Sequence, residues 1–206
     1  MTATPLELTF YAGAILILFL TPGPVWVAVT ARALSGGFAS AAPLAVGVAL
    51  GDVIWPLAAI FGLAWIVSAW AGAMEVLRWV AVGMFLFMGW QLIAHAARSL
   101  GSDSRLTRPG HWAGFAAGVT AILANPKAIL FYMGVLPGFF DLSRVTGPDI
   151  AAIIAISVLI PMLGNLGMAA LIGKVRALLR SPAALARMNR IAGVLLIGVG
   201  VAIALG

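Results

Sequence analysis

Residues 8–31 read LTFYAGAILILFLTPGPVWVAVTA, an uncharged stretch interrupted by Thr21-Pro22-Gly23-Pro24. An apolar segment of this length can cross a bilayer as a helix. Pro22 and Pro24 have no amide N–H, so the carbonyls of Leu18 and Leu20 lose their helical donors. In lipid, carbonyls freed in this way must find partners inside the protein or face water. The sequence therefore predicts a transmembrane helix that is broken near its middle.

A second break, Asn125-Pro126-Lys127, lies in another long apolar stretch, residues 112–140. Interrupted helices at corresponding places in two halves of a chain are typical of transporters that bind substrate near the bilayer midplane. The fourth stretch is longer than the ~20 residues needed to cross, so we expect it to be kinked or tilted.

The composition indicates an integral membrane protein with no separate soluble domain. Of 206 residues, 63% are hydrophobic and 9% are charged, and the mean hydropathy is +1.13. Cysteine is absent, which excludes disulfides and thiol chemistry. The net charge of +6 does not indicate a nucleic-acid partner, because the basic residues lie in short loops between apolar spans. The N-terminus lacks the basic region of a cleaved signal peptide.

We expect an all-α membrane protein with one transmembrane domain, residues 1–206. Its six spans lie near residues 7–31, 43–70, 74–97, 112–140, 148–173 and 188–206. Each half begins with a broken span, and Gly51-Asp52 in the second span corresponds to Gly164-Asn165 in the fifth. Since three spans is an odd number, the second half must insert upside down. The sequence predicts two inverted repeats, residues 7–97 and 112–206.

The loop charges predict an orientation. Nine of the twelve Lys and Arg residues lie in the loops after the first, third and fifth spans: Arg32, Arg98, Arg105, Arg108, Lys174, Arg176, Arg180, Arg187 and Arg190. The opposite loops carry only Arg78 and Arg144. The positive-inside rule makes the first set cytoplasmic and places both termini outside. A five-span arrangement, which would separate the termini, fits this bias less well.

Asp52 is the only acidic residue deep within a span, and inserting such a group costs about 2.5–3.5 kcal/mol. It is a candidate proton-coupling carboxylate, or the counter-charge for a substrate ammonium. The alternative is a structural ion pair or a hydrogen bond to the broken backbone.

Lys127 is the only basic residue deep within a span. It follows Pro126, where the restarted helix exposes amides and the positive end of its dipole. We expect Lys127 to meet a substrate carboxylate, to pair with Asp52, or to do both at different stages. Snorkelling to the outer surface would require the side chain to pass residues 128–140.

Other residues have supporting roles in this prediction. Pro22, Gly23 and Pro24 open the backbone so that its polar groups can act as ligands, although a plain proline kink is the alternative. Asn125 is expected to bond freed backbone groups, for instance the Ile122 carbonyl, or to touch a ligand. The tryptophans are expected mainly at the membrane interface or facing lipid, and a cavity-lining position is the less favoured alternative for Trp26 and Trp55. Close helix packing is expected at the pairs Gly47/Gly51 and Gly114/Gly118.

No protease, nucleotide-binding or metal-binding motif occurs in the sequence, so an enzyme is not expected and no cofactor is predicted.

The order and spacing of several motifs resemble the lysine exporter (LysE/RhtB) family of small amino-acid efflux proteins. The matching positions are Thr21-Pro22-Gly23-Pro24, Gly36-Gly37 to Gly47, Gly51-Asp52, Asn125-Pro126-Lys127, Phe131 and Pro137. The resemblance implies a secondary transporter of the bacterial inner membrane, driven by the proton-motive force, that exports amino acids or related metabolites. Many members carry a polar residue after Pro-Gly-Pro, where this chain has Val25 and Trp26, which indicates a more apolar pocket or a divergent substrate.

The leading expectation is a proton-coupled amino-acid exporter that alternates access by rocking its two halves. The expected site residues are Pro22, Gly23, Pro24, Asp52, Asn125, Pro126, Lys127 and Asn165. The expected partners are a small-molecule substrate, protons and the lipid bilayer, and a homo-oligomer is left open. The alternatives are a cation exporter and a non-transporting membrane scaffold. One carboxylate provides few ligands for a divalent cation, which usually binds several oxygen atoms.

Overall fold

The computed structural model describes residues 1–69, 73–96, 110–172 and 181–205. These residues form helices and no strand, which confirms the all-α prediction. The elements are α1 (Pro5–Leu20), α2 (Pro24–Ala69), α3 (Ala73–Ala94), α4 (His111–Leu123), α5 (Pro126–Gly134), the 3-10 helix η2 (Leu136–Gly138), α6 (Gly147–Ala170) and α8 (Pro182–Leu205).

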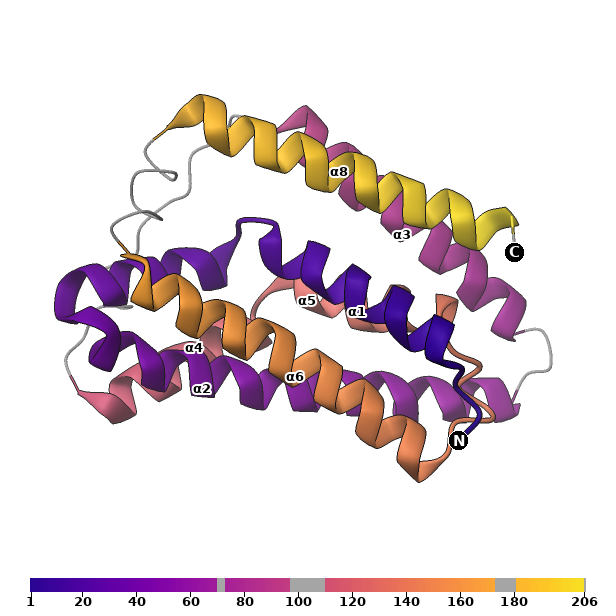
Figure 1. The fold of residues 1–206 in the computed structure, drawn as a ribbon. Coiled ribbons are helices and arrows are strands. Elements are labelled where there is room, and N and C mark those ends of the chain that lie inside the picture. The colour runs from indigo at the N-terminus through magenta and orange to yellow at the C-terminus, as the bar shows by residue number, and fades with distance from the viewer. Residues whose placement is uncertain (70–72, 97–109, 173–180, 206) are drawn as a thin grey trace.

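Helix α2 reverses direction at Gly36 and Gly37, whose backbone is not helical. Gly37 has φ of +69°, a value that glycine adopts without the steric cost that a side chain adds. The first part of α2, residues 24–35, continues the course of α1, and the second part, residues 38–69, runs back across the molecule (Figure 1). The loop expected between residues 31 and 43 is therefore wrong: the chain turns within one pair of glycines.

Within the described residues, length and apolar character identify two helices that can each cross a membrane, residues 24–62 of α2 and all of α6. Helices α4 and α5 make a third candidate as one span bent by 54°, which agrees with the expected kink. Helix α1 has 16 residues, about 24 Å, and is too short to cross a core of about 30 Å by itself. The six-span arrangement therefore stays a prediction. Helix α8 begins at Pro182, six residues before the expected 188.

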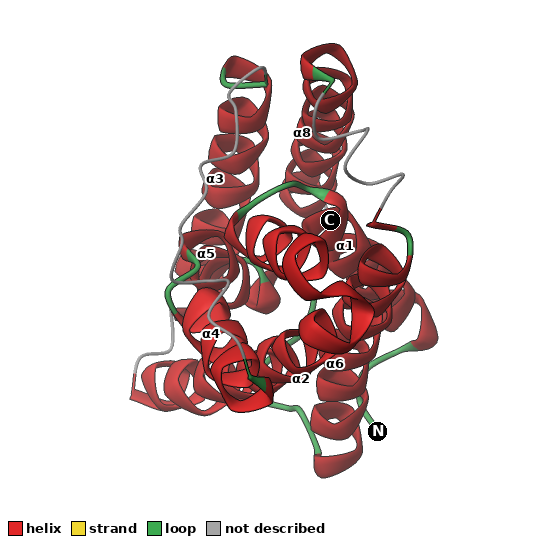
Figure 2. Cartoon of the chain, turned by 90° about the vertical axis from the view of Figure 1, so that its left-hand side faces the viewer, coloured by secondary structure: helices red, strands yellow, loops and turns green. Residues whose placement is uncertain are grey.

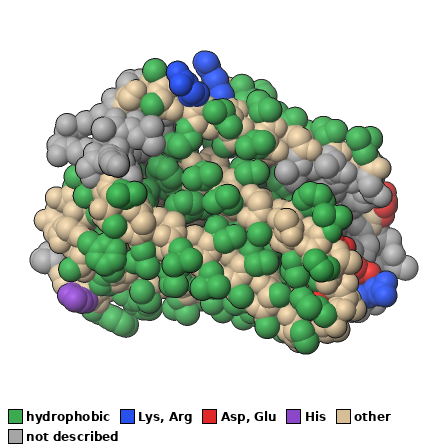
Figure 3. Space-filling view, viewed as in Figure 1, with side chains coloured by type: hydrophobic (Ala, Val, Ile, Leu, Met, Phe, Trp, Pro, Cys, Tyr) green, Lys and Arg blue, Asp and Glu red, His purple; other side chains and the backbone are tan. Residues whose placement is uncertain are grey.

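The helices form three groups (Figures 1 and 2). On one side, α2 packs against α4 and α6, and on the other, α3 packs against α8. Helices α1 and α5 lie between them, α1 in contact with α6 and α8, and α5 in contact with α2 and α3. Hydrophobic side chains cover the body of the outer face, and charged side chains gather at its edges (Figure 3). This distribution suits a protein surrounded by lipid.

Glycines set the closest helix approaches, as the sequence predicts for Gly47 and Gly118. A Cβ atom on Gly47 would clash with the Phe115 carbonyl oxygen of α4, and one on Gly118 would clash with the Leu44 carbonyl oxygen of α2. The pair α3 and α8 cross in the same way at Gly89 and Gly193. Each crossing brings backbone against backbone, so small residues there are a packing requirement.

Polar caps fix the ends of two helices at the same edge of the molecule. The Thr4 amide donates to the Glu7 carboxylate (2.7 Å), and the Glu7 amide donates to the Thr4 hydroxyl (3.2 Å), which starts α1. The buried Asp149 carboxylate at the start of α6 accepts the amides of Thr2 (3.0 Å) and Ala3 (3.0 Å). The N-terminal residues are therefore tied to α6.

Arg32, counted above among the loop cations, is buried within α2. Its guanidinium donates to the carbonyls of Ser40 (2.7 Å) and Gly110, so it joins the turn of α2 to the start of α4. Arg98, Arg105, Arg108, Lys174, Arg176 and Arg180, which carry much of the predicted charge bias, lie outside the described residues.

The substitution Gly118→Ala should destabilise the protein, because its methyl group must displace the Leu44 backbone of α2. Overpacking of this kind costs about 1–3 kcal/mol. Thermal unfolding of the purified protein should show a lower Tm for Gly118→Ala. The matched control is Gly13→Ala, whose added Cβ has nothing within 4 Å, and an equal Tm for the two variants would contradict the packing argument.

Candidate functional site

A small cavity lies where the two broken helices meet α2 and α6. Its volume is about 40 Å³, and its lining consists of Leu18, Phe19, Val25, Trp26, Val48, Asp52, Ile122, Asn125, Lys127, Ala128, Pro161 and Asn165. Four of the predicted site residues, Asp52, Asn125, Lys127 and Asn165, are thus brought together from the two halves of the chain. Of the other four, Pro22, Gly23 and Pro24 are not in the lining, and Pro24 and Pro126 begin helices α2 and α5 beside it.

The Lys127 ammonium binds the broken end of α1. Its Nζ donates to the carbonyl oxygens of Leu18 (3.0 Å) and Thr21. Leu18 carries one of the two carbonyls that the prolines were predicted to free. A Cβ on Gly23 would lie 3.4 Å from Nζ, an ordinary van der Waals distance, so Gly23 lies directly beside the ammonium. A cation at the carboxyl end of a helix also interacts favourably with the helix dipole.

The expected pairing of Lys127 with Asp52 is not present in this conformation. Among the described residues, the ammonium contacts only backbone carbonyls, and the Asp52 carboxylate contacts a tyrosine hydroxyl instead. Lys127 therefore stabilises backbone exposed by the first break rather than a buried acid. This role was absent from the sequence prediction, because it joins groups more than 100 residues apart.

Two indole groups satisfy carbonyls next to the breaks. Trp26 Nε1 donates to the Phe19 carbonyl (2.6 Å) in the last turn of α1, and Trp55 Nε1 donates to the Ile122 carbonyl (3.3 Å) in the last turn of α4. Trp26 also lines the cavity, which was the less favoured alternative for it, whereas Trp55 is not in the lining. Both tryptophans thus serve the broken backbone.

Asn125 has the backbone role that the sequence favoured, with a different partner. Its side-chain oxygen caps α5 by accepting the Lys127 amide (3.2 Å). The Ile122 carbonyl, suggested as its partner, accepts the Asn125 backbone amide (3.1 Å). The cap holds the start of α5, and with it the stem of Lys127, in a fixed position beside the cavity.

Two side-chain oxygens in the cavity lining have no hydrogen-bond partner: Oδ2 of Asp52 and Oδ1 of Asn165. Both residues are buried, with 3% and 1% of their surfaces exposed. Leaving such a group unpaired costs about 1–3 kcal/mol. These corresponding residues of the two halves therefore present free acceptors that a ligand, a water or a proton can satisfy.

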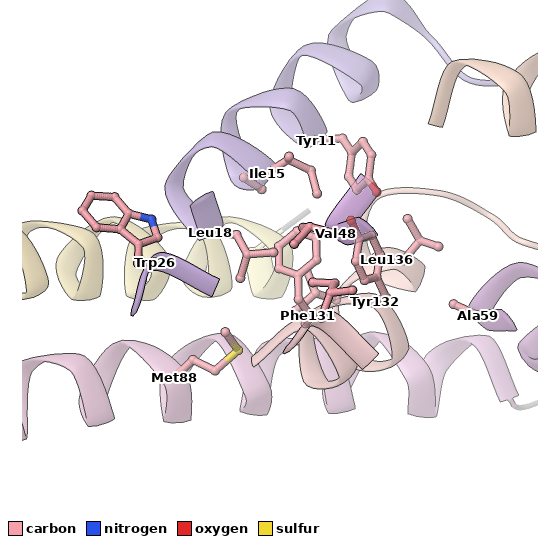
Figure 4. Close-up of a cluster of buried hydrophobic side chains, with 14 of the residues drawn as sticks. Tyr11, Ile15, Leu18, Trp26, Val48, Ala59, Met88, Phe131, Tyr132 and Leu136 are labelled. Carbon is pink, nitrogen blue, oxygen red and sulfur yellow. The ribbon is translucent and has the colours of Figure 1, made fainter. Parts of the chain in front are cut away.

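A chain of hydroxyl groups leads from Asp52 toward the edge where α1 and α6 begin. Tyr132 donates to Asp52 Oδ1 at 3.4 Å, a long contact. The Ser157 and Tyr11 hydroxyls are 2.7 Å apart. The hydroxyl ends of Tyr11 and Tyr132 face each other in Figure 4. The sequence analysis missed these residues, although Ser157 is separated by eight residues from both Asp149 and Asn165 on the buried face of α6.

The site is built from reciprocal contacts between the halves. A Cβ on Gly51, next to Asp52, would clash with the Ile122 side chain of α4. A Cβ on Gly164, next to Asn165, would clash with the Phe19 ring of α1. Ile122 and Phe19 are the same two residues whose carbonyls accept the indole N–H groups.

The cavity is too small for an organic substrate in this conformation. Ligand pockets usually enclose about 300–1,000 Å³, whereas about 40 Å³ is room for a few water molecules. The arrangement is a small cavity between two broken helices with polar groups from distant parts of the chain in its lining, and sites at such breaks are typical of membrane transporters.

Comparison with known proteins agrees with this class. The family model described as LysE type translocator matches residues 16–206. The chain belongs to this family. An uncharacterized membrane protein of Synechocystis sp. is 33% identical over 192 residues, which is 92% of this chain and 91% of the relative.

Two further relatives are named leucine efflux proteins. That of Salmonella choleraesuis is 30% identical over 140 residues, 68% of this chain and 64% of the relative. That of Klebsiella pneumoniae is 28% identical over 144 residues, 70% of this chain and 67% of the relative. The chain thus matches about two thirds of the length of these relatives. No solved structure gives a significant match.

The substitution Trp26→Phe should lower the free energy of unfolding by about 1–3 kcal/mol, because the part-buried Phe19 carbonyl loses the donor that the buried Trp26 supplies. Thermal or denaturant unfolding in detergent measures the change. Trp79→Phe is the control, since the exposed Trp79 bonds only Glu75 of its own helix, and it should change stability by less than about 0.5 kcal/mol. Equal losses would refute the capping role.

Proposed function

We propose that this protein exports amino acids with apolar side chains across the bacterial inner membrane, in exchange for protons. The observation that carries the proposal is the site itself, where a lysine ammonium and a buried carboxylate with a free oxygen share one cavity. The remaining lining is largely apolar, with Phe19, Val48 and Ile122 among it. The relatives named leucine efflux proteins support this class of substrate.

In the proposed arrangement, α1 and the first part of α2 form one broken span, and α4 and α5 form its counterpart. The second part of α2, α3, α6 and α8 complete six spans in two inverted halves. Three observations support it: the termini lie at one end of the molecule (Figure 1), the halves make reciprocal contacts at Gly51 and Gly164, and Gly89 meets Gly193. The termini then lie on the periplasmic side, as the loop charges indicate.

Substrate binding follows from the polar groups at the breaks. The substrate carboxylate meets the Lys127 ammonium and the amides at the start of α5, where the helix dipole favours an anion. The apolar side chain of the substrate contacts Trp26, Val48 and their neighbours. Rocking of one half against the other enlarges the cavity on one side at a time, and this motion alternates access.

Asp52 carries the coupled proton. It is the buried carboxylate of the cavity, and its Oδ2 is free to take a proton. Three titratable groups lie in this region: Tyr132 donates to its Oδ1, Lys127 lines the same cavity, and the Tyr11 hydroxyl contacts Ser157. In each cycle a proton from the outer side reaches Asp52 through the hydroxyl chain of Tyr11, Ser157 and Tyr132, and leaves on the inner side as the carrier resets.

Asp52→Asn should abolish the response of export to a pH gradient, because an amide cannot carry the proton. Vesicles loaded with radiolabelled leucine or a related apolar amino acid measure this, with efflux followed at several imposed gradients. Asp141→Asn is the matched control, since Asp141 is exposed and bonds only Ser143 near the surface. Export by Asp52→Asn that still rises with the gradient would refute the coupling role.

Tyr132→Phe removes one hydroxyl of the proposed proton route and keeps the ring. We expect gradient-driven efflux to slow several-fold, while exchange of labelled for unlabelled substrate, which needs no net proton movement, persists. Thr9→Val serves as a control, because its hydroxyl lies on the exposed part of α1. If both processes fall by the same factor, Tyr132 has only a structural role.

A further inference from the structure

We infer that the carbonyl oxygens of Leu18 and Thr21 form a subsite for the primary ammonium group of the substrate, which Lys127 fills while the carrier is empty. This inference rests on the proposed function and adds to it the position of the substrate's ammonium. The structure already shows these carbonyls binding a primary ammonium on an alkyl chain, namely that of Lys127.

The subsite lies at a place built to receive a cation. Its two carbonyls belong to the last turn of α1 and to the break, where no helical donor reaches them. They lie at the negative end of the α1 dipole. Gly23 lies directly beside the ammonium, and Leu18 lines the cavity. A ligand in the cavity is therefore adjacent to these oxygens.

Exchange of one ammonium for another satisfies every group. When Lys127 turns to the substrate carboxylate, Leu18 and Thr21 lose their donor, and each buried unpaired carbonyl costs about 1–3 kcal/mol. The substrate's own ammonium can replace the lysine there. Asp52 Oδ2 and Asn165 Oδ1 stay available to a proton or to the third N–H of the ligand.

This arrangement selects zwitterions. An amine without a carboxylate would take the carbonyls and leave the Lys127 ammonium unpaired. A carboxylate without an amine would take Lys127 and leave the carbonyls unpaired. Only a ligand with both groups replaces both interactions, which gives the carrier a reason to bind amino acids in preference to either half alone.

Lys127→Ala creates the vacancy, and n-propylammonium supplies the missing part, since its three carbons and nitrogen match Cγ, Cδ, Cε and Nζ. We expect n-propylammonium to raise the Tm of purified Lys127→Ala by about 2–4 °C or more once its concentration exceeds its Kd several-fold. The Tm of the wild-type protein should not change, because Lys127 covers the subsite. The compound n-propyltrimethylammonium has the same charge and no N–H donor, and it should have no effect.

Each outcome decides the inference. Stabilisation by both compounds, by neither, or of wild type and variant alike would overturn it. If Lys127→Ala does not fold alone, recovery of folded protein with n-propylammonium in the medium, and not with the trimethyl compound, supports the subsite, and failure of both overturns it.

The experiment also separates the subsite from the export function, because it needs no transport. Amine-specific stabilisation without amino-acid export would leave the subsite in place and refute the exporter. Amino-acid export without amine-specific stabilisation would support the exporter and refute the subsite.

Discussion

The structure depends on one constraint: a helix broken inside a membrane must satisfy the carbonyls that the break exposes. In α1 the protein meets this demand with side chains from distant segments. Lys127 of α5 binds the carbonyls of Leu18 and Thr21, and Trp26 of α2 binds that of Phe19. In the proposed arrangement the break lies in the hydrocarbon core, where water is absent, so each of these bonds replaces one that solvent cannot supply. The first break therefore holds the two halves together at the site.

The same constraint explains why the two halves match at the level of contacts. Gly51 of α2 leaves room for Ile122 at the end of α4, and Gly164 of α6 leaves room for Phe19 at the end of α1. In each case a polar residue, Asp52 or Asn165, follows the glycine and lines the cavity. Close packing against a broken end thus places an acceptor oxygen beside that end. In each of the dipeptides Gly51-Asp52 and Gly164-Asn165, the glycine allows the close packing and the next residue supplies the acceptor oxygen.

The sequence predicts the parts of this site better than it predicts their partners. A proline in the middle of a span predicts a break in the helix, and a polar side chain in an apolar helix must face the protein interior. Local chemistry therefore predicts that four side chains meet at the site: Asp52, Asn125, Lys127 and Asn165. The partner of Lys127 cannot be predicted from local chemistry, because a buried lysine can pair with a carboxylate or with a set of carbonyls. Only the packing of α5 near the end of α1 decides between these two partners. The hydroxyl chain was missed for a similar reason: Tyr11 and Ser157 lie on different helices, and their contact depends on helix rotation. The predicted helix ends were less accurate where the helix continues up to a tight turn, as it does at Gly37.

The bond from Lys127 to the end of α1 also bears on how an empty carrier stays closed. On the proposed mechanism, opening the cavity separates α5 from α1 and breaks this bond. Without a ligand, the cost is an unpaired ammonium and two unpaired carbonyls in a place of low dielectric, which amounts to several kcal/mol. A zwitterionic substrate removes that cost by pairing with both sides, so it shifts the equilibrium toward states from which it can leave. The interaction that repairs the broken helix then also ties movement of the halves to the presence of cargo.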